Sequence, residues 1–206
     1  MTKYVTRRGV RVAVLSGLLP FLVGGCALNE AEPADPQQGQ AAPDPETGPD
    51  LPNRPRDLPV SGLDEAQICK LIQPEQLDQL GVGGGNPAPK LNEQDFPGCS
   101  WLSESGASPS IGVLLSVAPM SIQDRLAETS GGTATTDTLD SGFGAVRSQV
   151  PGAESLGCVV AVDVAEGETL EAGLSWLGGD ELTNQDMCAK AKQAAEFAVS
   201  NLQAQG

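Results

Sequence analysis

The five cysteines are the residues of this chain whose type and spacing carry the clearest chemistry. Cys26 directly follows an apolar stretch, whereas Cys69, Cys99, Cys158 and Cys188 are spread over the rest of the sequence. No two of them form a CxxC pair, and the chain contains no histidine. Ser-His-Asp and Cys-His catalysis, the usual catalytic zinc site and histidine-ligated haem are therefore excluded. The cysteines indicate covalent attachment and cross-linking instead.

Cys26 has the sequence context of a lipid attachment site. Four basic residues near the N-terminus precede an apolar run at 12–23, which is too short for a permanent membrane span and is typical of a secretory signal peptide. The residues before the cysteine, VGG, resemble a bacterial lipobox, so residues 1–25 are predicted to be removed and Cys26 to be lipidated. An ordinary signal with an incidental cysteine is the alternative. The pair Arg7 and Arg8 matches a twin-arginine signal only in part, so the export route stays open, with the general secretory route favoured.

The mature chain is strongly acidic. Removal of the signal leaves 8 basic residues against 27 acidic ones, a net charge of −19. Such a polyanion is repelled by nucleic acid and by anionic lipid headgroups. The mature chain also lacks tyrosine and has few other aromatic side chains, so it offers no stacking surface for bases. We therefore exclude nucleic acid as a partner.

Residues 26–60 are predicted to be a lipidated cysteine followed by a disordered, acidic, proline-rich tether. Eight of the protein's 16 prolines fall between Ala27 and Val60. This segment has almost nothing apolar to offset the entropy lost on ordering. Fully extended, it would reach on the order of 100 Å from the anchor. A proline-rich docking ligand is the weaker alternative.

Residues 61–206 are long enough for a single extracytoplasmic domain with its own core. Apolar residues recur at helical spacing from Leu63 to Leu80, and Pro74 suits the first turn of a helix that ends at Gly81. The stretches CSWLSE and SIGVLLSVAP alternate with period two and predict a hairpin around 105–109. MSIQDRLAET predicts a short helix, and SGGTATTDTLDSG predicts a polar loop.

The second half of the domain is more regular. FGAVRSQ is a candidate strand, and CVVAVDVAEGETLEAGLSWL predicts two strands around a turn at Glu166 and Gly167. Thr183 and Asp186 have capping-box spacing before an alanine-rich C-terminal helix. The order of elements predicts an α+β fold, with a mainly antiparallel sheet and the N- and C-terminal helices packed on one face.

The four cysteines of the domain are predicted to form two disulfides, because an even number in an exported domain is typical of a disulfide framework. Three pairings are possible, and the sequence alone cannot choose among them. We favour Cys69 with Cys99 and Cys158 with Cys188, because each pair would join a helix to a neighbouring strand.

An enzyme with a carboxylate pair is the main rival to a binding domain. Asp163 and Glu171 could meet on the predicted hairpin, but their positions in the alternation favour solvated charges on the polar face of the sheet. A Ser-Lys dyad has no SxxK spacing to support it. We therefore assign no catalytic residue and predict that the protein is not an enzyme.

Other candidate sites are weaker still. Oxygen ligands cluster in GGDELTNQD and DTLD, but neither stretch has EF-hand spacing, so we expect loop and helix-capping roles and no metal or cofactor. The glycines at 83–85 lack the Lys-Ser/Thr of a phosphate-binding loop and predict an ordinary loop. Trp101 and Trp176 could line a ligand cleft, but core packing is favoured for both.

Four stretches together resemble a known family: ICKLIQPEQLDQLG, CSW at 99–101, GCVVAVDV at 157–164 and MCAKAKQAAEFAVSNL at 187–202. Behind a lipobox, this pattern resembles the actinobacterial lipoproteins that carry domain of unknown function 3558. The resemblance implies a cell-envelope lipoprotein of high-GC Gram-positive bacteria with a four-cysteine framework and no established reaction. The order of elements also looks similar to the PsbP/Mog1-like fold, which by itself does not fix a function.

We therefore expect a lipoprotein anchored to the cell membrane through Cys26, on its extracytoplasmic face. Its domain is expected to bind an envelope protein or a small amphiphilic ligand. The alternatives are a carboxylate-dependent cell-envelope hydrolase and a purely structural surface protein. A hydrolase predicts carboxylates converging in the largest cleft, a ligand carrier predicts a deep apolar cavity, and a protein-binding module predicts an exposed apolar patch.

Overall fold

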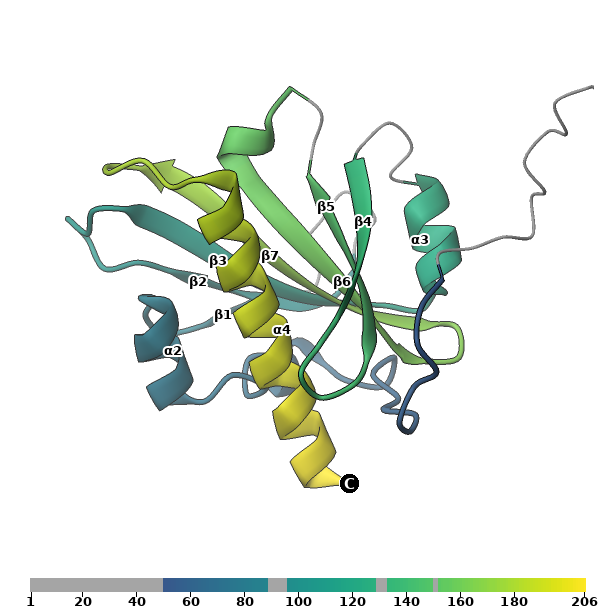
Figure 1. Cartoon of the computed structure of the whole chain (residues 1–206). Coiled ribbons are helices and arrows are strands. Elements are labelled where there is room, and N and C mark those ends of the chain that lie inside the picture. Colours follow the sequence, from purple (N-terminus) through teal and green to yellow (C-terminus); the bar gives the residue numbers. More distant parts are fainter. Residues whose placement is uncertain (1–49, 89–95, 129–132, 150–151) are drawn as a thin grey trace, which may run out of the picture. The chain divides into compact units, whose positions relative to one another are not determined.

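The computed structural model describes residues 50–88, 96–128, 133–149 and 152–206, which form an α+β domain (Figure 1). The helices are α1 (Glu65–Ile68), α2 (Pro74–Leu80), α3 (Ile122–Glu128), α4 (Asn184–Gln205) and the short 3-10 helix η1 (Glu154–Leu156). The strands are β1 (Asn86–Ala88), β2 (Gly98–Leu102), β3 (Ser110–Ala118), β4 (Thr133–Thr138), β5 (Gly144–Gln149), β6 (Gly157–Ala165) and β7 (Glu168–Gly178). They make one antiparallel sheet in the order β1-β2-β3-β7-β6-β5-β4. The predicted fold class is confirmed.

Helix α2 begins and ends where its sequence predicts. Pro74 occupies the first turn, and Gly81 ends the helix in the left-handed conformation, with φ of 81°. Glycine adopts this conformation without the steric cost that a Cβ brings. The helix prediction for this stretch is therefore confirmed, although a separate turn of helix, α1, precedes it.

Apolar residues alternate along the central strands, so that one face of the sheet forms the core, as predicted. The hairpins β2–β3 and β6–β7 and the pairing of β3 with β7 keep the buried positions of neighbouring strands side by side. Trp101 is fully buried on this face, whereas Trp176 packs against its margin and donates its Nε1–H to the backbone oxygen of Asp180. Other buried strand residues on this face include Cys99, Ile111, Val113, Leu115, Val117, Ala145, Cys158, Val160, Val162, Val164, Leu170, Ala172 and Leu174.

Helix α4 lies across this core face (Figure 1). Thr183 and Asp186 form the capping box that their spacing predicts, each side chain accepting the other's backbone N–H. Half of the eight buried residues of the helix are alanines, Ala191, Ala194, Ala195 and Ala198. Because these side chains are short, the helix backbone can lie close to the sheet.

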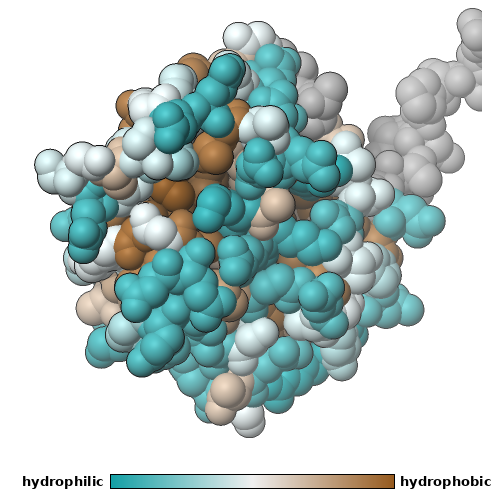
Figure 2. Space-filling model, turned by 60° about the vertical axis from the view of Figure 1, so that its left-hand side comes forward, coloured by the Kyte–Doolittle hydropathy of each residue, from teal (hydrophilic) through white to brown (hydrophobic). Residues whose placement is uncertain are grey.

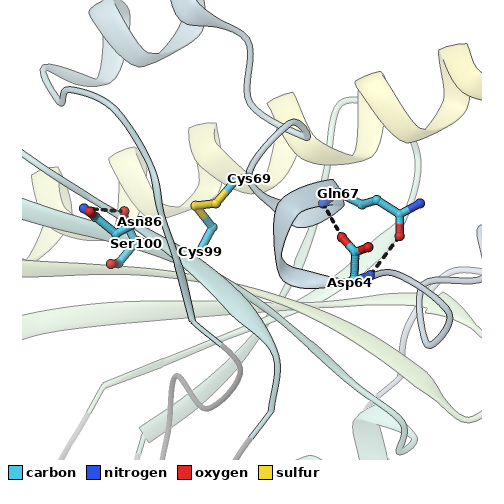
Figure 3. The surroundings of a disulfide bond; sticks show 6 residues. All are labelled: Asp64, Gln67, Cys69, Asn86, Cys99 and Ser100. Carbon is cyan, nitrogen blue, oxygen red and sulfur yellow. Dashed lines mark hydrogen bonds between the residues drawn. A yellow bond between two sulfur atoms is a disulfide. The ribbon is translucent and has the colours of Figure 1, made fainter.

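The two disulfides have the pairing that we favoured, Cys69–Cys99 and Cys158–Cys188. The first ties the end of α1 to β2, as Figure 3 shows, and the second ties α4 to β6. Gly85 lies against the first disulfide, where a Cβ would come within 2.7 Å of the Cys99 Sγ. The loop that we predicted at 83–85 therefore needs glycine at its last position because the backbone approaches the disulfide so closely.

Strand β4 corrects one prediction. We expected the stretch from 130 to 142 to be a polar loop, but residues 133–138 pair with β5 in a regular antiparallel register from Thr133 opposite Gln149 to Thr138 opposite Gly144. Four of these six residues are threonine, whose β-branched side chain favours strands. The prediction relied on the polar side chains of this stretch, but β4 lies at the edge of the sheet, where a strand need not be apolar.

Helix α3 also departs from the expected arrangement, because it does not share the core face with the other helices. Ile122 packs on Val146 and Ala161, which alternate with core residues and therefore belong to the opposite face of the sheet, here called the outer face. The prediction that helices cover one face holds for the N- and C-terminal helices. The outer face, which we expected to be wet, is partly covered by α3.

The ordered domain begins earlier than the boundary that we predicted at residue 61. Leu51 packs beside Ile122 on the outer face, Leu58 donates its N–H to the Val164 carbonyl, and Val60 is fully buried. Residues 51–61, here called the N-terminal strap, therefore belong to the domain and not to a tether. The predicted tether thus includes residues 51–60, which pack on the domain, because single apolar side chains among prolines carry no periodic signal.

Glu168 fixes the end of the N-terminal strap. Its carboxylate accepts the backbone N–H groups of Val60 and Ser61 and the Ser61 hydroxyl. Burial raises the pKa of Glu168, but these hydrogen bonds outweigh burial and leave the pKa below its usual value. The charged carboxylate therefore stabilises the folded state at neutral pH, and this contribution is lost as the pH falls through the lowered pKa.

We predict that Glu168→Gln lowers the free energy of unfolding at pH 7 by about 1 kcal/mol. The difference from the wild type should disappear in acid, because the wild-type carboxylate is protonated there. Urea denaturation between neutral pH and about pH 3 measures both quantities. A difference that stays constant over this range would contradict the assigned role of the Glu168 carboxylate.

Candidate functional site

The predicted site residues are the lipidation site Cys26 and the four cysteines of the domain. Cys26 lies outside the described residues, so the predicted lipidation stays a prediction. Cys69, Cys99, Cys158 and Cys188 are cross-linked in pairs and serve the fold. Within the described ranges, no group of three or more cysteine, aspartate or glutamate side chains could hold a metal ion. The acids of the two oxygen-rich stretches include Asp186, which caps α4, and Asp137, which binds Lys192.

Asp163 lies beside a cavity with a volume of about 370 Å³. The walls come from the N-terminal strap together with Gln123 and Asp163. Arg54 donates from one guanidinium nitrogen to both Asp163 oxygens at 2.8 Å and from Nε to Asp57 at 2.9 Å. Burial lowers the pKa of Arg54, but the two carboxylates outweigh it and raise the pKa above its usual value. The two acids of this cavity are therefore held by one permanently charged guanidinium.

Glu171 is buried, contrary to the expectation of a solvated charge. Only 3% of the residue is exposed, and its carboxylate accepts from the Arg125 guanidinium of α3. The ion pair holds α3 on the outer face of the sheet. Beside it lies a second cavity of about 10 Å³, enough for roughly one water molecule. Asp163 and Glu171 thus bind different arginines, and each carboxylate is used within the fold.

A patch of exposed leucines is the feature of the outer face that no internal contact explains. Leu102, Leu156 and Leu177 are the large hydrophobic residues that remain more than half exposed in the described chain, with exposures of 52%, 54% and 56%. They come from three segments that are far apart in the sequence. Leu102 and Leu177, together with the half-buried Leu114, are here called the leucine patch.

The register of the sheet brings these leucines together. Leu102 of β2 pairs with Gly112 of β3, and Gly112 pairs with Ser175 of β7, two residues before Leu177. A Cβ on Gly112 would lie 3.3 Å from a methyl carbon of Leu102 and 3.6 Å from one of Leu177. The two side chains therefore converge over the bare backbone of one glycine.

The rest of the leucine patch continues along the same strands. Leu114 lies over Gly173 in the same way, since a Cβ there would come within 2.9 Å of the leucine side chain. The third exposed leucine, Leu156, lies in η1 directly before Gly157, which pairs with Ser175 on β7. Figure 2 turns the left-hand side of Figure 1, where β2 and β7 end and β3 begins, towards the viewer, and it shows hydrophobic residues exposed between hydrophilic ones.

Sequence reasoning missed the leucine patch, although a signal was present. In a strand with one buried face, alternation predicts polar residues at every second position. Leu102 follows the buried Trp101, and Leu177 follows Trp176, so both leucines occupy positions on the face opposite the core. A leucine where alternation predicts a polar residue marks an apolar outer face.

The leucine patch and the N-terminal strap lie at opposite ends of the sheet. Arg54 of the strap binds Asp163, and Asp163 is separated from Gly157 along β6 by about 20 Å. In Figure 1 the strap runs at the right beside α3, whereas β2 and β3 turn into each other at the left. No helix within the described ranges is both long and apolar enough to cross a membrane.

Fold and site together define an antiparallel α+β domain that is cross-linked by two disulfides and carries an exposed apolar patch on its outer face. The chain belongs to the family described as protein of unknown function (DUF3558), whose model matches residues 21–201. The matched range includes Cys26 and all four disulfide cysteines. No curated protein and no solved structure matches the chain. The similarity to the PsbP/Mog1-like fold stays a prediction.

Proposed function

We propose that this protein is an actinobacterial envelope lipoprotein, anchored through Cys26 on the extracytoplasmic face of the membrane, whose domain binds a protein partner through the leucine patch. The observation that carries the binding proposal is the convergence of Leu102 and Leu177 over Gly112. Exposed apolar side chains that meet from different strands are typical of a protein interface, whereas single exposed leucines are not.

The cavities beside Asp163 and Glu171 are not suited to an amphiphilic ligand. The cavity of about 370 Å³ has ligand-like size, but charged and amide side chains contribute most of its lining. The apolar cavity beside Glu171, at about 10 Å³, is too small for a lipid chain. Neither offers the deep apolar interior that a carrier of amphiphiles needs.

The ion pairs also weigh against a carboxylate-dependent hydrolase. Such an enzyme needs one carboxyl group that keeps a proton near neutral pH and a second that stays charged. In the cavity of about 370 Å³, Asp57 and Asp163 share the guanidinium of Arg54 instead. Both acids are thus held by the same cation and serve the attachment of the N-terminal strap.

The anchor is supported by the order of features at the N-terminus and by a family match that begins at residue 21, ahead of Cys26. We expect Cys26→Ala to release the protein from the membrane fraction and to remove the lipid mass from its mature N-terminus. Fractionation with intact mass spectrometry measures both. A Cys26→Ala protein that stays membrane-bound and a wild type without lipid would contradict the anchor.

The binding proposal is tested by replacing Leu102 and Leu177 together with serine in the full chain. Because both side chains are more than half exposed, the double variant should fold with a loss of about 1 kcal/mol or less. Affinity capture from the protein's own envelope, with Cys26 intact, should recover a partner with the wild type and lose it with the variant. Identical recovery from both would contradict the proposal and favour a structural surface protein.

A further inference from the structure

The charged residues around the leucine patch all have the same sign. Glu104 lies in the β2–β3 turn, Glu154 lies in η1, and Asp180 and Glu181 follow β7. These are the segments that carry the exposed leucines, and they contain no lysine or arginine. Each of these four acids lies within four residues, in the sequence, of an exposed leucine, and together they are here called the acidic rim.

The acidic rim is not neutralised within the described chain. No ion pair joins any of its four carboxylates to a lysine or arginine among these residues. Hydrogen bonds from the backbone N–H groups of Glu154 and Gly152 lower the pKa of Glu154, so this carboxyl group stays charged well below neutral pH. Asp180 is held in place through its backbone, because its N–H donates to the Ser108 hydroxyl.

The basic residues of the described domain lie elsewhere and are largely used within the fold. Arg54 binds Asp57 and Asp163, Arg125 binds Glu171, and Lys192 binds Asp137. Arg56 and Lys190 donate to backbone carbonyls of Gln203 and Leu80. The four acids of the rim are therefore left without an ion-pair partner among the described residues.

We propose that the leucine patch docks a basic protein segment, with apolar side chains that cover the leucines and lysines or arginines that meet the acidic rim. This inference rests on the proposed function and names the chemistry of its partner. An apolar centre bordered by charge is the usual arrangement of a protein interface, and opposite charges on the two sides steer the partners together.

The same charges disfavour the other occupants of the patch. From residue 50 onward the sequence has 22 acidic and 8 basic residues, so two copies would bring two strongly negative surfaces and two acidic rims together. An anionic membrane surface would be repelled for the same reason. The strap lies at the opposite end of the sheet from the patch.

The test uses the full lipidated chain in phosphatidylcholine nanodiscs and two synthetic helical peptides of equal length. One peptide has leucines on one face and lysines on the other, and the second has glutamate in place of lysine. Hydrogen exchange of residues 100–112 and 174–182 reports contact at the patch. Calorimetric titration gives the affinity, and empty nanodiscs correct for lipid binding.

We expect the Leu/Lys peptide to slow exchange in these two segments and the Leu/Glu peptide to leave them unchanged. The rim variant Glu104→Gln/Asp180→Asn/Glu181→Gln should weaken binding of the Leu/Lys peptide about tenfold. The matched control Glu75→Gln/Asp78→Asn/Glu166→Gln removes the same charge from exposed sites outside the acidic rim. The affinity of this control for the Leu/Lys peptide should stay within about twofold of the wild type, because salt screens the interaction of exposed charges beyond roughly 8 Å.

Three outcomes would overturn the inference. Equal binding of both peptides, equal effects of the two charge variants, or protection outside the two segments would each exclude a basic partner at the rim. If both peptides protect the patch and Leu102→Ser/Leu177→Ser abolishes that protection, the charge inference fails while the docking surface stands. If that double variant binds the Leu/Lys peptide as the wild type does, the patch itself is not the docking surface and the proposed function fails with it.

Discussion

Replacing Cys158 and Cys188 together by alanine is expected to lower the free energy of unfolding by roughly 3–4 kcal/mol. The disulfide joins residues that are separated by 30 positions, so its loss restores considerable freedom to the unfolded chain. It also attaches α4 to β6 across the core, and both sulfur-bearing residues are almost fully buried. Since domains of this size are stable by about 5–15 kcal/mol, a substantial share of the stability depends on this bond.

Urea denaturation of the full chain at pH 7 measures this loss. Cys69→Ala/Cys99→Ala is the matched comparison, because its loop has the same sequence separation of 30. The two double variants should lose similar amounts. A change below about 1 kcal/mol in both would contradict the disulfide framework, as would an intact mass with four free thiols in exported, oxidised protein.

Replacing Glu171 by glutamine is expected to cost about 3 kcal/mol of stability. The substitution preserves the size of the side chain but takes the negative charge away from the Arg125 guanidinium, which is only 13% exposed. A buried charge without its counterion is costly because water cannot solvate it. The destabilisation should be largest in α3, which the ion pair attaches to β7.

The control for Glu171→Gln is Arg125→Met/Glu171→Leu, which removes both charges and keeps apolar volume. Replacement of a whole buried pair is often neutral, so the double variant should be at least 2 kcal/mol more stable than the single one, as an order of magnitude. Denaturation curves and hydrogen exchange of residues 122–127 measure both effects. Equal loss in the two variants would show that size and shape matter at this position and charge does not.

Much of the core side of the fold could be predicted because its signals are local and periodic. Alternation of apolar residues identified the strands on either side of the Glu166–Gly167 turn, and a proline and a glycine marked the two ends of α2. Thr183 and Asp186 marked the start of α4. In each case a short stretch of sequence contains both the pattern and its limits.

The outer face could not be predicted in the same way, because its contacts join segments that are far apart in sequence. Arg125 is 46 residues from Glu171, and Arg54 is 109 residues from Asp163. No local pattern tells an exposed acid from one that binds a distant arginine. The N-terminal strap was missed for the same reason, because its partners lie on β6 and β7.

The sequence predicted which chemistry the candidate site lacks, but it did not predict the leucine patch. The absence of histidine and the spacing of the cysteines already argued against most catalysis. The leucine patch depends on register, since Leu102 and Leu177 meet only because β2 and β7 flank β3 at Gly112. Their positions in the alternation gave a signal, but convergence over one glycine is a property of the assembled sheet.

Site-specific photocrosslinking at position 177 is the most direct test of the central claim that the leucine patch binds a protein. A benzoylphenylalanine placed at Leu177 of the full chain, in its own envelope, should form a discrete adduct with a protein on irradiation. The same probe at Ser200, an exposed position on α4, should not give this adduct. Adducts with lipid alone, or the same protein adducts from both positions, would contradict the account.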